Sequence, residues 1–278
     1  MKTTTNYLIL NQASSDIFIT IVELISMLLP FDHVGNRWLG GLLGLITCKI
    51  FQVSTFIAPF FSIWVLVTIA IERFYAVIRP LKPSPVSRHL KKTILLLWAW
   101  SVASSTEYLV SANVFQFGEH YYCYQPIPRW FILGTILNIL LPLLVIIVLY
   151  IIVCHKLWLR KVPGEGTIQN RGQVEAIKTA KKVTVMMITI VAVYVLCWIP
   201  LDVYIILVFW EYVEINYSIY LFLVWLTVSF SGLNPYIYVA FSKKFRNGLK
   251  NLFGNCFCKI KVHNAFSFRS QSVELKQF

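Results

Sequence analysis

The sequence is poor in charged residues, and poorest in acidic ones. Only 13% of its 278 residues are charged, and 12 acidic side chains stand against 25 lysines and arginines. A soluble globular domain carries roughly 25% charged residues, so this shortage disfavours an ordinary soluble enzyme or binding module. Hydrophobic residues make up 58% of the chain instead. The composition therefore predicts a membrane protein.

Two further features are missing. No cleavable signal is visible at the start, because Lys2 is followed by a polar run and then by a segment that contains Asp16 and Glu23. No internal or inverted repeat of the kind that marks many transporters is present. The first apolar segment is therefore expected to direct membrane insertion itself.

Long apolar runs fill most of the chain. Each is long enough to cross a hydrocarbon core of about 30 Å as a helix. Six such segments are predicted, at 5–30, 45–76, 91–112, 127–156, 177–209 and 215–240. Pro142, Pro200 and Pro235 lie inside three of them, where a proline removes a backbone hydrogen bond and leaves a hinge or kink. The pattern predicts an all-α membrane protein whose bundle changes shape.

Basic residues gather on one side of these segments. Only Arg37, Lys49 and Arg129 fall on the other side, while the remaining 22 of the 25 lie on the opposite side, in the loops 77–92 and 155–182, at the two chain ends and, for Arg73, at the end of a segment. Short cytoplasmic loops collect Lys and Arg, so the basic side is predicted to be cytoplasmic. The net charge of +13 then reflects topology and attraction to anionic membrane lipid. Nucleic acid is not an expected partner, because the charge is dispersed over loops.

The cysteines divide between the two sides. Of six, only Cys48 and Cys123 fall on the extracellular side, where a disulfide persists. They are predicted to pair and to tie the loop 113–126 to the second apolar segment. Cys256 and Cys258 follow an amphipathic stretch and are candidates for palmitoylation, with two ordinary free thiols as the alternative.

The chain after the last apolar segment changes character. Apolar residues recur at helical spacing between Phe245 and Phe253, which predicts a short interfacial helix. Polar, aperiodic sequence follows and predicts disorder. The expected organisation is a transmembrane bundle with its amphipathic helix at 1–253 and a disordered cytoplasmic tail at 254–278.

Four acidic residues qualify as candidates for charges inside the membrane: Asp16, Glu23, Glu72 and Asp202. A charge at the bilayer centre costs at least ~2.5 kcal/mol, so each is a functional candidate. Glu72 beside Arg73 has the alternative interpretation of a charge pair at the lipid boundary. Paired acids also occur in intramembrane proteases and ion pathways, but the Gly-rich context of the former and the repeats of the latter are missing.

Several short motifs occur in order along the chain. They are Asp16 in the run that starts at Asn11, Cys48, the triplet Glu72, Arg73 and Phe74, Trp98, Pro142 with Tyr150, the run Cys197, Trp198, Ile199 and Pro200, and the run Asn234 to Tyr238 followed by Phe245 and Arg246. Together they resemble the signature of rhodopsin-like (class A) G-protein-coupled receptors over residues 5–253. The resemblance implies a seven-transmembrane receptor bundle with six of its helices present, plus the amphipathic helix. We expect the family's first transmembrane helix to be missing.

The resemblance also implies a function that is not enzymatic. A ligand bound outside repacks a core switch, and a heterotrimeric G protein is engaged inside. The residues implied in G-protein coupling are Glu72, Arg73, Phe74, Tyr150 and Tyr238. The residues implied in the switch are Trp198, Pro200, Pro142, Ile63, Tyr194, Asn234 and Pro235. A multi-pass receptor of the plasma membrane is expected.

The resemblance implies no organic cofactor and no other metal, but one candidate allosteric sodium ion. Its implied ligands are Asp16, Ser62 and Asn234. Phe230 stands where an asparagine often supports this ion, which is a departure from the family pattern.

The missing lysine and acid and the charge of the outer parts reduce the number of candidate ligand classes. No lysine lies between Lys182 and Lys243 to hold retinal, and Thr55 replaces the acid of aminergic receptors. Seven acidic residues against three basic ones lie in the outer parts, which favours a cationic ligand. Alternating aromatics around Cys123 resemble the β-hairpin of peptide receptors, and Lys181 with Lys182 also resembles that branch.

A basic neuropeptide is therefore the expected ligand. A small cationic amine or another small molecule, or a truncated fragment that does not signal, are the alternatives. Asp202 is predicted to be the main counter-ion, with Glu23 second, because it lies four residues beyond Trp198 on the same helix face. The other candidate ligand contacts are Thr55, Gln52, Glu119 and Glu107. The alternative for Asp202 is that it only solvates a water pocket or pairs with Tyr204 or another neighbour.

Overall fold

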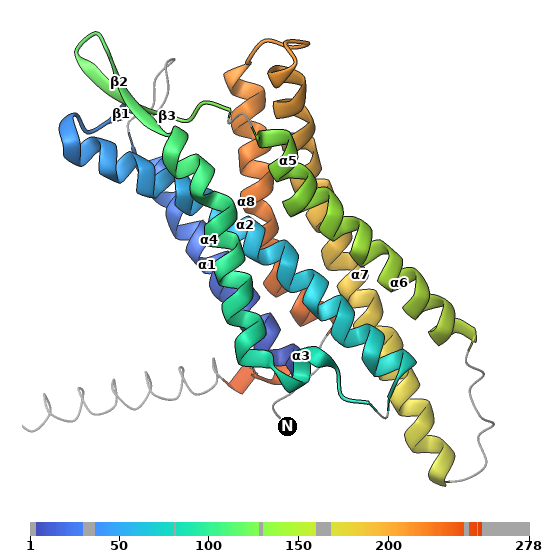
Figure 1. The fold of residues 1–278 in the computed structure, drawn as a ribbon. Coiled ribbons are helices and arrows are strands. Elements are labelled where there is room, and N and C mark those ends of the chain that lie inside the picture. The colour runs from blue at the N-terminus through green and yellow to red at the C-terminus, as the bar shows by residue number, and fades with distance from the viewer. Residues whose placement is uncertain are drawn as a thin grey trace, which may run out of the picture. The chain divides into compact units, whose positions relative to one another are not determined.

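Long helices make up most of the chain (Figure 1). The computed structural model describes residues 4–29, 37–80, 82–127, 130–159, 168–241, 245–248 and 250–251. The long helices are α1 (Thr4–Leu28), α2 (Gly41–Ile78), α4 (Leu90–Ser111), α6 (Leu141–Leu159), α7 (Ile168–Phe209) and α8 (Tyr217–Phe241). Each coincides with one of the predicted apolar segments, so the all-α expectation is confirmed. The short α3 (Pro85–Arg88) lies between α2 and α4.

Within the described residues, five helices are long and apolar enough to cross a membrane. The more polar α4, which carries Lys91, Lys92 and Glu107, is the long helix that is not among them. The helices also expose large apolar side chains: Leu95 is 70% exposed, Leu144 62% and Leu196 69%. Such surfaces require cover by lipid or by other protein.

The buried core is centred on α2, which packs against α1, α4, α6 and α7. Every side chain from Ala58 to Ala70 is buried except that of Trp64, which is half-buried. A helix that is apolar on all its faces belongs in a core. On one side of this core, the Trp98 ring of α4 stacks on Phe61 with centroids 3.9 Å apart.

Prolines interrupt more helices than the sequence predicted. Pro142, Pro200 and Pro235 lie inside α6, α7 and α8 as expected, but Pro59 lies inside α2 as well, so the prediction of three such helices was incomplete. Ahead of Pro142, the helix α5 (Phe131–Thr135) and the π-helical turn η1 (Ile136–Leu140) run directly into α6. A π turn fits this position, because Pro142 has no N–H to donate.

A small antiparallel sheet covers one end of the helices. Its strands β1 (Arg37–Trp38), β2 (Asn113–Phe117) and β3 (His120–Tyr124) lie in the order β1-β3-β2. The register pairs Phe117 with His120, which leaves a two-residue turn with a φ of 60° at Gly118. Glycine adopts this conformation without strain, as a tight hairpin requires. The predicted β-hairpin is confirmed, and β1 is an additional strand.

The contacts divide the chain into two units, Met1–Pro235 and Tyr236–Phe278. In the second unit, residues 245–248 and 250–251 are helical, in agreement with the predicted amphipathic helix. Arg246 Nη1 donates hydrogen bonds to the carbonyl oxygens of Val239 at 2.9 Å and Ala240 at 3.0 Å. Cys256, Cys258 and the predicted tail lie outside the described residues.

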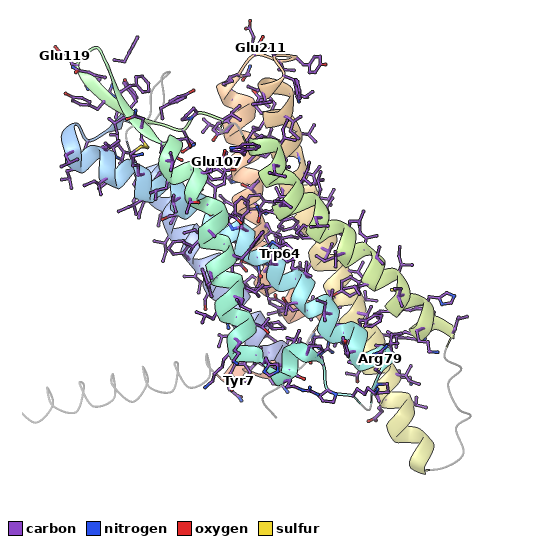
Figure 2. The ribbon with its side chains drawn as sticks, in the orientation of Figure 1. Tyr7, Trp64, Arg79, Glu107, Glu119 and Glu211 are labelled. Atoms are coloured by element: carbon purple, nitrogen blue, oxygen red, sulfur yellow. A yellow bond between two sulfur atoms is a disulfide. The ribbon has the colours of Figure 1, made fainter. Side chains whose placement is uncertain are left out.

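The first unit has two ends that differ in chemistry. The end with the sheet is called the hairpin end, and the opposite end is called the Arg73 end. Figure 2 places Glu107, Glu119 and Glu211 towards the hairpin end and Arg79 towards the Arg73 end.

Candidate functional site

A buried carboxylate joins α1 to α8 in the interior of the first unit. Asp16 is only 7% exposed, and its Oδ2 accepts a hydrogen bond of 2.9 Å from Asn234 Nδ2. Its Oδ1 lies 3.4 Å from Gln12 Nε2 and 3.4 Å from Ser231 Oγ. Hydrogen bonds to a charged group are stronger than neutral ones, so these contacts hold the two helices together.

A pair of serines extends the cluster to α2. Ser15 Oγ donates to the carbonyl oxygen of Ala58 at 3.1 Å and lies 3.3 Å from Ser62 Oγ. Ser62, a predicted sodium ligand, therefore reaches α1 through the residue next to Asp16. The sequence interpretation missed Gln12, Ser15 and Ser231. Gln12 could have been found from its spacing of four residues before Asp16, which places both on one helix face.

The residues of this cluster fit a sodium ion. Asn234 Oδ1 and Gln12 Oε1 are buried and have no hydrogen-bond partner. Together with the Asp16 carboxylate and the serine hydroxyls they form an all-oxygen donor set, which suits a hard cation. Phe230 supplies no oxygen and instead packs edge-on against Tyr194, with ring centroids 5.3 Å apart.

The predicted switch residues lie mostly in the core. Tyr194 is 1% exposed and stacks on Trp198 of the same helix, with centroids 5.8 Å apart. Ile63 of α2 and Pro142 of α6 are also buried. Tyr194 thus contacts two aromatic rings, those of Trp198 and Phe230, so a shift of either ring would disturb its packing.

Asp202 lies one helical turn beyond Trp198 in α7. Its Oδ2 is buried and has no hydrogen-bond partner, and the same holds for Trp198 Nε1. The Tyr204 hydroxyl is occupied elsewhere, because it accepts from Asn216 N at 2.7 Å and lies 3.3 Å from Asn216 O. The alternative that Asp202 pairs with Tyr204 is therefore wrong.

The other predicted ligand contacts differ in their surroundings. Glu107 Oε1 accepts a hydrogen bond of 2.9 Å from the backbone N–H of Trp130, so it already fastens the start of α5. Glu119 is exposed at the hairpin turn, and Glu23 is half-buried in α1. Thr55 Oγ1 donates to the carbonyl oxygen of Gln52 at 2.7 Å, within α2.

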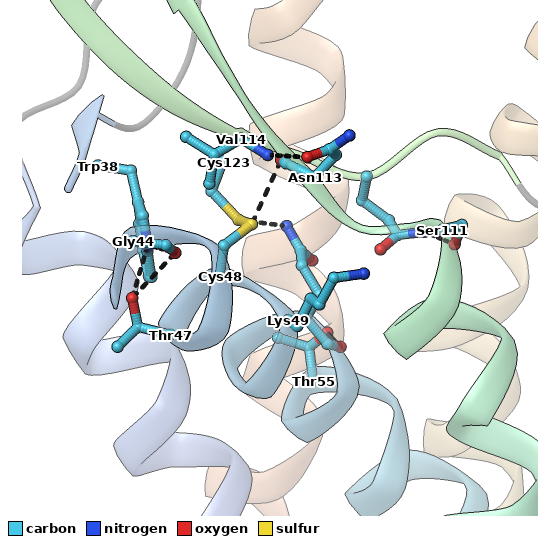
Figure 3. Close-up of a disulfide and its surroundings, with 12 residues drawn as sticks. Trp38, Gly44, Thr47, Cys48, Lys49, Thr55, Ser111, Asn113, Val114 and Cys123 are labelled. Atoms are coloured by element: carbon cyan, nitrogen blue, oxygen red, sulfur yellow. Dashed lines mark hydrogen bonds between the residues drawn. A yellow bond between two sulfur atoms is a disulfide. The ribbon is translucent and has the colours of Figure 1, made fainter. Parts of the chain in front are cut away.

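The predicted disulfide between Cys48 and Cys123 is present and joins α2 to β3 (Figure 3). Gln52 Nε2 lies 3.5 Å from Cys123 Sγ, one turn below the bridge. Lys49 Nζ donates to the carbonyl oxygens of Leu109 at 2.8 Å and Val110 at 3.2 Å, at the end of α4. The hairpin is therefore fixed to α2, and α2 is fixed to α4.

At the Arg73 end, the charged side chains have partners within the chain. Arg73 Nη2 donates to Thr5 Oγ1 of α1, and Glu72 Oε2 accepts from Ser84 Oγ. Ser84 also caps α3 by accepting from the backbone N–H of Ser87 at 2.9 Å. Glu72 and Arg73 are thus hydrogen-bonded to different neighbours, and the interpretation of a charge pair between them stays an alternative.

Apolar contacts join α2, α6 and α7 at the same end. Val77, Val153 and Leu157 form a buried cluster, with Phe74 and Ala180 packed against it.

On the surface beside this cluster, Lys181 Nζ of α7 lies 5.3 Å from the ring centroid of Trp158 of α6. Of the predicted coupling residues, Tyr150 is buried in α6 and Tyr238 belongs to the second unit.

Comparison with known proteins gives one consistent result. Residues 1–238 match the family model described as 7 transmembrane receptor (rhodopsin family). The chain is similar to the substance-P receptor of Aquarana catesbeiana, at 30% identity with 92% of this chain and 64% of that protein covered. It is 31% identical to the substance-P receptor of Canis lupus familiaris, with the same shares covered. The neuromedin-K receptor of Mus musculus is 30% identical, with 97% of this chain and 61% of that protein covered. The chain spans less than two thirds of the length of these curated relatives.

Proposed function

The chain belongs to the rhodopsin family of seven-transmembrane receptors, and from this membership we propose that it passes the binding of an extracellular peptide to a cytoplasmic heterotrimeric G protein. This is the work of a receptor and not of an enzyme. The observation that carries the proposal is the family match over residues 1–238, which includes both Arg73 and the region around Trp198. The plasma membrane is the proposed location, with the hairpin end outside and anionic lipid at the basic face.

A peptide is the ligand that the relatives favour. Their names refer to substance P and neuromedin K. In this chain the acidic residues of the hairpin end, among them Glu119 and Glu211, give that end a charge that attracts a basic peptide. The hairpin, fixed by its disulfide, supplies an aromatic surface beside which such a peptide would lie.

The proposed mechanism uses the packing between the two ends. A ligand that contacts Trp198 would move its ring against Tyr194, and a shift of Tyr194 would in turn disturb its edge-on contact with Phe230. Two discrete packings of such a core bias one helix towards one of two positions. Movement of α7 away from α6 would open the Arg73 end to the G protein, and Arg73 would there exchange its bond to Thr5 of α1 for a bond to the G protein.

The sodium ion is proposed as a modulator of this change. When bound, the ion would supply a positive charge beside the Asp16 carboxylate. The Asn234 amide would keep that carboxylate in position through its hydrogen bond. Asp16, Asn234, Ser62 and Gln12 would hold the ion, and the bound ion would favour the packing in which α1, α2 and α8 stay together. Loss of the ion would loosen that packing.

The proposal is tested in cells that express the full chain. Substance P, neuromedin K and a panel of other amidated basic peptides are applied, and nucleotide exchange on each class of heterotrimeric G protein is measured. We expect at least one peptide to increase exchange, and the Arg73→Ala variant at equal surface expression to show no increase. If no peptide acts but small amines do, the ligand class is wrong. If exchange never exceeds that of untransfected cells with either kind of ligand, the signalling function is wrong.

A further inference from the structure

Two unpaired polar groups lie one helical turn apart on α7. Asp202 Oδ2 is a hydrogen-bond acceptor and Trp198 Nε1 is a hydrogen-bond donor, and both are buried without a partner among the described residues. Residues four apart on a helix are neighbours on one face, about 5–6 Å apart at their Cβ atoms. The pair therefore presents an acceptor and a donor side by side.

An arrangement of this kind is unfavourable in the empty protein. The buried Oδ2 of Asp202 loses its hydration and gains no compensating hydrogen bond. Nearly all buried polar groups in folded proteins are paired, so an unpaired one requires an explanation. An absent ligand that supplies a cation and a carbonyl oxygen would satisfy both groups at once.

The other predicted acidic ligand contacts are less suitable binding sites for a cation. Glu107 already accepts from the Trp130 backbone, and Glu119 is fully exposed on the hairpin turn. An exposed carboxylate contributes little to binding, because water screens it. Glu23 is half-buried and its carboxylate oxygens are not among the enclosed, unpaired atoms.

Aromatic rings stand near the Asp202 carboxylate. The ring of Trp198, one turn before Asp202 on α7, stacks on Tyr194 with centroids 5.8 Å apart. Aromatic faces attract cations, and a guanidinium also stacks on them.

We propose that Asp202 and Trp198 together bind one basic residue of the ligand, with Asp202 accepting from its guanidinium or ammonium group and Trp198 Nε1 donating to a nearby peptide carbonyl oxygen. The proposal rests on the proposed function and narrows it. A simple amine has the cation but no carbonyl oxygen, so the pair selects a basic peptide residue, and arginine best because its planar guanidinium matches a carboxylate.

The first test uses the empty protein. The full chain is purified in detergent, and the thermal unfolding midpoint of Asp202→Asn is compared with that of the parent chain. If Asp202 is unpaired, removal of its charge raises the midpoint or leaves it unchanged. A Glu214→Gln variant, in which an exposed acid of the following loop is changed, controls for the loss of one negative charge. A clear fall for Asp202→Asn alone would show an internal partner and overturn the proposal.

The second test measures binding by the rise in unfolding midpoint with two probes. N-acetyl-arginine amide has a cation and carbonyl oxygens, and N-acetyl-citrulline amide is its neutral analogue of similar shape. We expect the arginine compound to stabilise the parent chain and the Glu214→Gln variant, and the citrulline compound to act far more weakly. For Asp202→Asn the half-maximal concentration of the arginine compound should rise by about 10- to 150-fold.

Trp198→Phe isolates the donor. It keeps an aromatic ring but removes the N–H, so it should weaken both probes by a similar factor. Equal responses of the parent chain and Asp202→Asn, equal responses to the two probes, or no response of the parent chain up to the solubility limit would each overturn the proposal. No G protein is present, so failure here leaves the signalling proposal standing, whereas failure of signalling with intact probe binding overturns only that proposal.

Discussion

The regions around Asp202 and Arg73 both hold a charged side chain inside the same unit, yet they are satisfied to different degrees. Arg73 donates to Thr5 and its neighbour Glu72 accepts from Ser84. Asp202 Oδ2 is buried without a hydrogen-bond partner, and so is the indole Nε1 of Trp198 one turn away. Arg73 thus has one bond within the chain while its Nε stays buried and unpaired, whereas neither Asp202 Oδ2 nor Trp198 Nε1 has a hydrogen-bond partner among the described residues.

The difference separates two tasks. A charged group that is already bonded stabilises the arrangement in which it is found, so the Arg73 end holds the helices in one position. A charged group without a hydrogen-bond partner favours the state in which a ligand supplies that partner, so the Asp202 region is expected to respond to a ligand. Substitutions at the first region should change signalling with binding intact, and substitutions at the second should change binding.

The largest effect is expected for Arg73→Ala. Arg73 lies at the end where we propose the G protein to bind, so its loss should abolish stimulated nucleotide exchange. Probe binding at the other end, measured by thermal stabilisation with N-acetyl-arginine amide, should stay within about twofold of the parent value. Impaired probe binding combined with normal exchange per bound receptor would reverse the roles of the two regions.

A smaller effect is expected when the hairpin end is released. The disulfide between Cys48 and Cys123 closes a span of 75 residues, and loss of such a link typically costs about 2–5 kcal/mol. Cys48→Ser should lower the thermal unfolding midpoint and weaken probe binding. Cys154→Ser, which changes a half-buried free thiol of α6, is the matched control and should do neither. A Cys48→Ser variant with unchanged stability and binding would show that the hairpin does not shape the Asp202 region.

Much of the fold could be predicted from the sequence. Length and apolar character place six helices, because a helix must be long to cross a bilayer. The cysteine pair followed from the side on which Cys48 and Cys123 fall, and the hairpin from the alternating aromatics around Cys123 that resemble those of peptide receptors. These features depend on local pattern, which a sequence displays directly.

The partners of the charged residues could not be predicted in the same way. Thr5 and Arg73 lie 68 positions apart in the sequence, and Ser231 and Asp16 lie 215 apart. A hydroxyl group gives no sequence signal of its own, because serine and threonine occur throughout membrane helices and bond mostly to their own backbone. Which hydroxyl meets which charge is decided by the packing of the helices, and that packing is not visible in a pattern of apolar residues.

An intermediate effect is expected at Asp16, which lies between the two regions. Replacing choline chloride by sodium chloride at constant ionic strength should stabilise the parent chain, by about 1.4 kcal/mol when sodium is present at about ten times its dissociation constant. Asp16→Asn should lose this response, because it removes the only charged oxygen of the cluster. Asn234→Ala should weaken it, since that variant removes one oxygen donor and leaves the carboxylate. A sodium response that persists in Asp16→Asn would place the ion elsewhere.

The smallest effect tests whether weak contacts also restrain the Arg73 end. Lys181 lies over the Trp158 ring, which is 53% exposed, and cation–π contacts at exposed sites contribute about 0.5–1 kcal/mol. If this contact keeps α7 against α6, Trp158→Leu should raise ligand-free nucleotide exchange by about 2- to 5-fold, the factor that such an energy corresponds to. Trp158→Phe keeps an aromatic face and should raise exchange less.

The cation of the same contact is removed in Lys181→Gln. Lys182→Gln changes the exposed neighbouring lysine and controls for the lost positive charge. Exchange that rises equally in Lys181→Gln and Lys182→Gln would mean that net charge at this face, and not the ring contact, sets the basal level. Unchanged exchange in Trp158→Leu would assign the restraint to the contacts that both chains share, which are the bond of Arg73 to Thr5 and the apolar cluster of Val77, Val153 and Leu157.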